Sequence, residues 1–317
     1  MKRLLLAAML ALAAVAAGAQ DWPSKPVRVI VPFPAGGATD LVARMVTQKL
    51  TENLGRQFFV ENRGGAGGLV GSEVAAKATP DGYTLIVGTS GTHAINFSLY
   101  SNPSYDPVKD FIAVTRLAVL PSMILVNASL PVNSLGELVA HAKANPGKLA
   151  YASAGNLLYL TGAMFTSTAG IDMLHVPFKG AGPQIAAISN NDVQVAVTPV
   201  FSALPALKSG KARALAVTTL RRSAAAPEYP TVAESGFPGF DAASWYALFA
   251  VAGTPKPIVD RLSAETRKVL ATPEMKETLL KQGAEPALDT VDQFTAIVKN
   301  DVAMWARIVK QTGAKAE

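Results

Sequence analysis

The chain has 317 residues and no cysteine, so disulfides and thiolate metal sites are excluded. Half of its residues are hydrophobic and 16% are charged, a composition that predicts a buried α/β core rather than a disordered chain. The formal charge is +6, but the lysines and arginines are scattered and not interleaved with aromatic residues, which argues against a nucleic-acid partner.

The first 19 residues are typical of a secretory signal peptide. Lys2 and Arg3 precede an uncharged apolar run at residues 4–17, and residues 17–19 carry a small-residue A-x-A cleavage site. The alternative is a membrane anchor, but the run is shorter than the roughly 20 residues that span a bilayer. We therefore expect cleavage after residue 19 and a periplasmic mature chain that begins near Gln20.

Short β-branched runs, bounded by Gly, Pro, Asn or Ser, predict the strands. In chain order they are residues 27–33, 58–62, 83–88, 111–119, 122–128, 149–154, 173–178, 193–199, 212–219 and 245–252. Helical patterns lie between them, which is the βαβ rhythm of a parallel sheet.

Three helices have clear sequence signals. After the first strand, one apolar stripe recurs at helical spacing: Leu41, Val42, Met45, Val46 and Leu50. Thr254-Pro255-Lys256-Pro257 opens a second helix with proline in its first turn. Thr290 and Gln293 form a capping-box pattern before a third apolar stripe at residues 294–309.

Two extended stretches, residues 111–128 and 240–252, are too long for single core strands and predict crossings between two lobes. They divide the chain into a first lobe of residues 20–118 and 237–317 and an inserted second lobe of residues 119–236. The predicted fold class is α/β, a two-lobed periplasmic binding protein (a Venus flytrap) with two crossover connections and a ligand cleft between the lobes.

The turn after the first strand is suited to an anion although it has no cationic side chain. Its residues are Pro34, Ala35, Gly36, Gly37, Ala38, Thr39 and Asp40. Ligands of open α/β sheets lie where strands end and helices begin, and a helix start offers unpaired N–H groups and a partial positive charge. An ordinary tight turn is the alternative, with Asp40 favoured there by the helix dipole.

Three further small, polar turns follow predicted strands. They contain Thr89 and Ser90 in the first lobe, and in the second lobe Ser153, Ala154, Gly155 and Asn156, then Lys179 and Gly180. Together with the first turn, they predict a cleft lined with hydrogen-bond donors. Lys179 would either meet a ligand carboxylate or be solvated. Trp245 and Tyr246 would either present an edge to the cleft or pack between the lobes.

Four segments resemble the Bug-type solute-binding receptors of tripartite tricarboxylate transporters: PFPAGGATD (32–40), residues 61–88 ending in PDGYTLIVG, VPFKGAGPQ (176–184) and WYALFAVAGTPKPIVDRL (245–262). The similarity extends from about Trp22 to the C-terminus. It implies a flytrap that closes on a small carboxylate, such as a di- or tricarboxylate, an acidic amino acid or an aromatic carboxylate.

The resemblance also implies how the solute is held and which partners exist. Backbone amides, hydroxyls and bridging waters would hold the carboxylate, carried over by position to residues 34–40, 89–90, 153–156 and 179–180. Two membrane subunits of the transporter are implied as partners, with a sensor kinase in some members, and we expect a monomer. The alternative function is a ligand-presenting adaptor for such a kinase.

The second-lobe turn departs from the family pattern S-x-G-x-G-[NS]-x-x-H-L. Residues 153–160 are about two residues shorter than that pattern, and Tyr159 stands where the histidine usually falls. This difference affects the half of the site that the second lobe supplies.

Other chemistries have weaker signals. The glycines of residues 64–68 lack the third glycine and the GK[ST] of nucleotide loops, so we expect a turn that opens the second helix. Ser90 and His93 could form a nucleophile and base, but no third member is identifiable. His93, His141 and His175 lack metal-site spacing. We expect a protein that is not an enzyme, without metal or cofactor.

Overall fold

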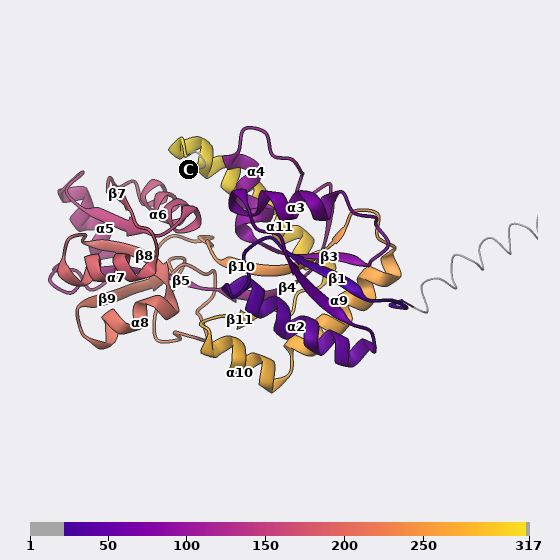
Figure 1. Ribbon diagram of the computed structural model, residues 1–317. Coiled ribbons are helices and arrows are strands. Elements are labelled where there is room, and N and C mark those ends of the chain that lie inside the picture. Colours follow the sequence, from indigo (N-terminus) through magenta and orange to yellow (C-terminus); the bar gives the residue numbers. More distant parts are fainter. Residues whose placement is uncertain (1–21, 315–317) are drawn as a thin grey trace, which may run out of the picture.

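A computed structural model describes residues 22–314, and it has two lobes, each built on its own β-sheet (Figure 1). The predicted signal peptide, residues 1–19, lies outside the described residues. Between residues 22 and 314, no helix combines the length and the apolar character that a membrane crossing needs.

The first-lobe sheet has six strands in the order β11-β4-β10-β3-β1-β2. Their bounds are β1 Val27–Val31, β2 Phe58–Asn62, β3 Thr84–Thr89, β4 Phe111–Leu120, β10 Ser244–Val251 and β11 Glu285–Pro286. The second-lobe sheet has the order β7-β6-β8-β5-β9. Its strands are β5 Ser122–Asn127, β6 Ala150–Ser153, β7 Leu174–Pro177, β8 Val195–Pro199 and β9 Ala212–Val217.

The chain passes twice between the two sheets. The first crossing is at Pro121, between β4 and β5, and the second lies between β9 and β10, at residues 218–243. The extended stretch 111–128 is therefore two strands of different sheets, as its length indicates, whereas most of 240–252 is the single strand β10. The lobe limits set from the sequence stay predictions.

The strand that enters each sheet after a crossing is antiparallel to its neighbours. β10 is antiparallel to β3 and β4, and β5 is antiparallel to β8 and β9. A strand that arrives from the other lobe enters its sheet at the edge where the remaining strands end, so it must run in the opposite direction. The expectation of parallel sheets is therefore wrong: both sheets are mixed, and the βαβ units within them are parallel.

This topology brings the ends of both sheets to the crossovers. In the first lobe, Thr89 at the end of β3 pairs with Tyr246, near the start of β10. In the second lobe, Pro199 at the end of β8 pairs with Ser122, the first residue of β5. The turns that follow β1, β3, β6 and β7 therefore lie on the sheet edges where the chain passes from one lobe to the other.

Helices cover the faces of both sheets (Figure 1). The first lobe contains α2 Ala38–Leu54, η1 Ala66–Gly68, α3 Leu69–Ala76, the π-helical turn η2 Gly91–Ile95, α4 Asn96–Leu99, α9 Lys256–Leu270, α10 Pro273–Lys281 and α11 Val291–Thr312. The second lobe contains α5 Leu135–Ala144, α6 Asn156–Ala169, α7 Ala181–Asn190 and α8 Val200–Lys208. The glycine-rich residues 64–68 indeed form the turn before α3.

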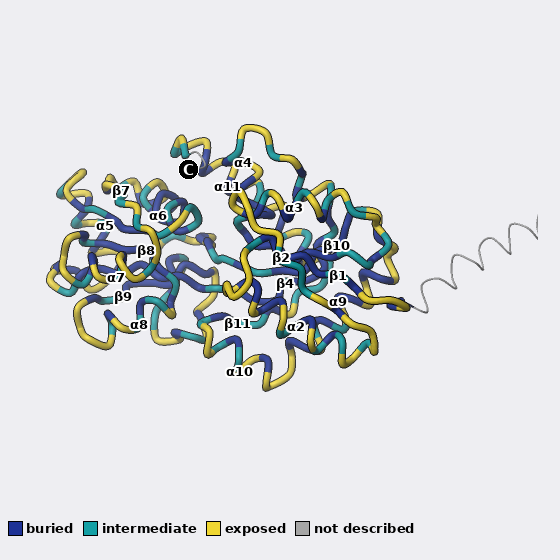
Figure 2. The backbone as a smooth tube through the Cα atoms, viewed as in Figure 1, coloured by how far each residue is buried: buried dark blue, intermediate teal, exposed yellow. Residues whose placement is uncertain are grey.

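Buried apolar side chains line both sheets, and the buried backbone in Figure 2 follows the strands. One cluster of buried residues includes members of both lobes, such as Ile86 and Trp305 in the first and Tyr151 and Phe165 in the second. The predicted stripe on α2 is buried at Val42, Val46 and Leu50, but Leu41 is 44% exposed. The capping box at Thr290 and Gln293 is confirmed.

Candidate functional site

The turn between β1 and α2 is open to solvent. Residues 34–38 are exposed, and Gly36 has a φ of 84°, a left-handed conformation that glycine adopts without steric cost. Gly37 is the N-cap of α2, and no side chain caps the helix there within the described chain. The first amides of α2 therefore stay available as donors at the positive end of the helix dipole.

Asp40, which is 2% exposed, holds this turn from the inside. Its Oδ2 accepts hydrogen bonds from the Gly36 backbone N at 2.9 Å and from Arg44 Nε at 3.0 Å, and its Oδ1 accepts one from Asn62 Nδ2 at 2.9 Å. Burial raises the pKa of Asp40, but these hydrogen bonds outweigh burial and set the pKa below its ordinary value. The ionised carboxylate therefore shapes the turn, and a direct contact between Asp40 and a ligand stays a prediction.

Neither side-chain partner of Asp40 was predicted from the sequence. Arg44 also donates from Nη2 to Asn62 Oδ1 at 3.0 Å, and Asn62 Nδ2 donates to the Phe33 carbonyl at 3.1 Å. The i,i+4 spacing from Asp40 could have identified Arg44, which is half exposed. Asn62 ends a different strand and has no local signal. Residues 34–40 contain no cationic side chain, but the guanidinium of Arg44 lies one helical turn beyond Asp40.

Tyr246 connects this turn to the end of β3. Burial raises the pKa of Tyr246, and the interaction of its phenol with Thr39, which is 7% exposed, offsets part of that rise. Tyr246 also pairs with Thr89 in the sheet. The residue therefore lies between two of the predicted donor turns.

Thr89 and Ser90 are buried, and their hydroxyls have partners within the first lobe. Thr89 Oγ1 accepts from the Thr92 backbone N at 3.2 Å, and Ser90 Oγ lies 3.3 Å from Ser244 Oγ. Thr92 Oγ1 in turn accepts from the Thr89 backbone N at 2.9 Å. These bonds close the turn after β3, and contact between its residues and a ligand stays a prediction.

Trp245 points to the opposite face of β10 from Tyr246. It is 1% exposed, its Nε1 donates to Asp301 Oδ2 at 2.8 Å, and its ring packs edge-on against Phe294 at 5.4 Å. Burial, with a further contribution from the charge of Asp241, raises the pKa of Asp301 to about 6. Both partners belong to the first lobe, and contact between Trp245 and a ligand stays a prediction.

The second-lobe turn after β6 has a buried start and an open end. Ser153 is 1% exposed and its Oγ lies 2.8 Å from His175 Nε2, whereas Gly155 is exposed, with a φ of 90°. Gly155 is the N-cap of α6, which no side chain caps among residues 22–314. Ala154 and Asn156 on either side are half-buried.

The imidazole of His175, on β7, lies beside the turn after β6. Tyr159 occupies the position where the family pattern has histidine, and its ring lies 4.3 Å from that of His175 on β7. The sequence placed His175 in a strand but gave no sign that the parallel pairing of β6 and β7 would bring it beside Ser153. The turn therefore keeps a histidine neighbour, supplied by another element.

Lys179 and Gly180 belong to the second of the two donor turns predicted in the second lobe, and both are exposed. Gly180, with a φ of 114°, is the N-cap of α7, again without a side-chain cap in the described part of the chain. The structure thus sorts the predicted residues into two groups on the crossover edges: residues 34–40 and 89–90 in the first lobe, and residues 153–156 and 179–180 in the second. Trp245 belongs to neither group.

The predicted alternative of a Ser90–His93 pair has different partners for its two members. His93 is 0% exposed, its Nδ1 lies 2.8 Å from Thr92 Oγ1, and its ring stacks on Phe249 at 4.1 Å. Burial lowers the pKa of His93 to about 3, so the imidazole is neutral. Ser90 contacts Ser244 instead. Between residues 22 and 314, no three His, Asp or Glu residues are grouped as a metal site would require.

Comparison with known proteins identifies the family. The model described as "Tripartite tricarboxylate transporter family receptor" matches residues 42–314. The chain belongs to this receptor family. Protein BugT of Bordetella pertussis is 34% identical over 300 residues, which cover 94% of this chain and 92% of BugT. The resemblance to Bug-type receptors is thereby confirmed, and the family is one of receptors rather than of enzymes.

Solved structures of relatives carry ligands. An R. palustris protein with adipate is 34% identical, with a TM-score of 0.73, over 93% of this chain and 99% of that one. MatC from Rhodopseudomonas palustris with bound malate is 33% identical, with a TM-score of 0.69, over 91% of this chain and 100% of that one. Together with the two sheets and two crossings, these similarities confirm the two-lobed fold class predicted from the sequence.

Proposed function

We propose that this protein is an extracytoplasmic solute-binding protein that captures a small carboxylate between its lobes and delivers it to the membrane subunits of a tripartite tricarboxylate transporter. One observation carries the proposal. Three helices, α2, α6 and α7, begin on the crossover edges of the two sheets without a side-chain cap among the described residues. Each start offers amide donors to an anion located between the lobes.

The class of ligand is a carboxylate. Two relatives of the same family have solved structures with adipate and with malate, both of which are dicarboxylates. Amide and hydroxyl donors suit such groups, and Lys179 and Arg44 add cationic side chains near the two groups of donors. Di- and tricarboxylates, acidic amino acids and aromatic carboxylates all fit this description.

The available donors are sufficient for useful affinity. Hydrogen bonds to a charged group contribute about 1.5–3 kcal/mol each, so five would give roughly 7–15 kcal/mol before costs. Loss of rigid-body freedom removes about 4 kcal/mol or more. The remainder includes micromolar binding, which corresponds to about −8 kcal/mol.

Binding would also change the relative position of the lobes. A ligand that contacts both sheet edges binds more tightly when these edges are close, so it favours a closed state. A membrane subunit could then distinguish loaded from empty receptor by the distance between lobes. We infer a periplasmic location from the predicted signal peptide, and a role without turnover from the receptor family.

A titration with purified carboxylates tests this function. The mature chain is unfolded and refolded to remove carried-over solute, and its Tm is measured with adipate, malate and, as a neutral control, hexane-1,6-diol. A ligand at a hundred times its Kd stabilises the folded state by about 2.7 kcal/mol, a rise of several degrees. A rise with a carboxylate but not with the diol is expected. Equal effects of acids and diol, or none with any carboxylate of a broad panel, would reject the proposal.

A further inference from the structure

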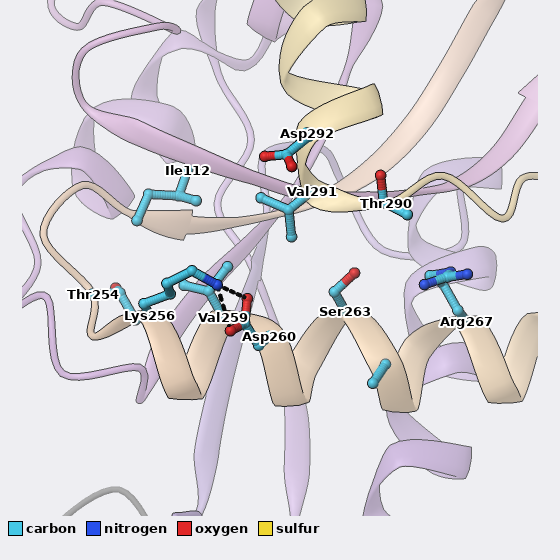
Figure 3. A pocket seen from close by; sticks show the side chains of 11 residues that line it. Ile112, Thr254, Lys256, Val259, Asp260, Ser263, Arg267, Thr290, Val291 and Asp292 are labelled. Carbon is cyan, nitrogen blue, oxygen red and sulfur yellow. Dashed lines mark hydrogen bonds and ion pairs between the residues drawn. The ribbon is translucent and has the colours of Figure 1, made fainter. Parts of the chain in front are cut away.

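A groove of about 390 Å³ lies on the first lobe, between α9 and the start of α11 (Figure 3). Small-molecule sites commonly have volumes of about 300–1,000 Å³. Ile112, Val259 and Val291 give the groove an apolar part. It is separate from the crossover edges, because Ile112 stands near the start of β4 and the crossover follows its end at Leu120, roughly 26 Å further along the strand.

Two polar groups in this groove have no partner within residues 22–314. Ser263 is 5% exposed, its side chain points from α9 into the groove, and its hydroxyl makes no hydrogen bond there (Figure 3). Arg267 lies one turn further along α9, and its Nε is buried without a hydrogen-bond partner. Buried polar atoms in proteins almost always have partners, so the Nε of Arg267 indicates a ligand that the groove would hold, and the Ser263 hydroxyl is a free donor beside it.

The start of α11 supplies further donors. Thr290 is the N-cap of this 22-residue helix, and the capping box occupies the backbone N–H groups of Thr290 and Gln293. The amides of Val291 and Asp292, the first two helical residues, are not used by the box. They lie at the positive end of the helix dipole and line the same groove.

The charges around the groove favour an anion at one end. Lys256 and Asp260 form an ion pair at 2.6 Å and offset one another. Asp292 is exposed, and in Figure 3 it lies on the far side of Thr290 from Arg267. Within the described residues Arg267 has no ion pair, so its guanidinium is the cation that a ligand would meet.

We propose that this groove is a second ligand site, which binds a carboxylate with a short apolar chain. The guanidinium of Arg267, the hydroxyl of Ser263 and the first amides of α11 bind the carboxylate, and Ile112, Val259 and Val291 contact the chain. Such a group comes either from a free small acid or from a glutamate side chain of a partner protein. The site does not depend on the function proposed for the crossover edges.

The test is a titration of the ¹⁵N-labelled mature chain with butyrate, followed by NMR. Saturable shifts of the amides of Ser263, Val291 and Asp292 are expected, and butylammonium should cause none. Arg267→Gln should weaken butyrate binding at least tenfold, and Ser263→Ala several-fold. Lys268→Gln is the matched control, because Lys268 is an exposed cation of the same helix that pairs with Glu265 outside the groove.

A blocked tripeptide with a central glutamate distinguishes the two sources. Butyrate binding at least as tightly as the tripeptide indicates a site for free acids, and binding of the tripeptide alone indicates a partner's side chain. Absence of saturable shifts with both probes overturns the proposal, and so does an equal affinity of wild type, Arg267→Gln and Ser263→Ala. Because none of these readouts involves the crossover edges, they are independent of the test of transport function.

Discussion

Replacing Asp40 with alanine should destabilise the first lobe and disorder the turn after β1. The substitution removes the acceptor for the Gly36 amide and for Asn62, two hydrogen bonds to a buried carboxylate. At about 1.5–3 kcal/mol each they total roughly 3–6 kcal/mol. Water can solvate the freed groups of the exposed turn, so we expect a loss of about 2–4 kcal/mol in the free energy of unfolding.

Urea unfolding at neutral pH measures this loss, and Arg44→Ala is the control. The Asp40–Arg44 ion pair has a half-exposed partner and should contribute less than about 1 kcal/mol. Since the pKa of Asp40 is lowered on folding, its stabilisation is present above the ordinary value of 3.8 and disappears as the pH falls through the folded-state pKa. A variant Asp40→Ala within about 0.5 kcal/mol of wild type would refute this role.

Three further predictions concern the core. Because burial raises the pKa of Asp301 to about 6, the free energy of unfolding should fall as the pH rises from about 4 to 6. Asp301→Asn should remove this pH dependence from the urea midpoints. An unchanged pH profile in the variant would contradict the assignment to Asp301. Trp245→Phe should lower the free energy of unfolding by about 1–3 kcal/mol, because the hydrogen bond to Asp301 is lost, and should leave the carboxylate affinity unchanged. Calorimetry that shows weaker binding without a loss of stability would instead favour a contact between Trp245 and the ligand. Gly88→Ala should destabilise the protein by about 1–3 kcal/mol or more, because the new Cβ would clash with the buried ring of His93; an unchanged Tm would argue against that packing.

Local sequence patterns predicted most of the elements. Each of the ten predicted strands overlaps an observed strand, because β-branched runs between Gly, Pro and Asn mark strands wherever the residues are buried. The strand β11 was missed, since its two residues, Glu285 and Pro286, form no pattern and pair with β4 only through tertiary contact. Strand directions also depend on where the chain re-enters a sheet, which local patterns do not encode.

The candidate site was predicted as turns but not as contacts. The positions of Gly36, Gly155 and Gly180 before helices could be read from spacing. The partners that hold the turns come from distant elements: Asn62 reaches Asp40 from β2, and His175 reaches Ser153 from β7. Alternation along β10 places Trp245 and Tyr246 on opposite faces of the sheet, with Tyr246 near Thr39. The strand period predicts this alternation, but only the assembled sheet determines which face each side chain occupies.

Small-angle scattering from the mature protein, with and without the carboxylate that raises its Tm most, tests the central claim most directly. Capture between the lobes predicts a smaller radius of gyration at saturation, with no change for a neutral analogue of the same length. An unchanged radius of gyration, with calorimetry showing the site to be full, would contradict binding between the lobes and place the carboxylate within a single lobe.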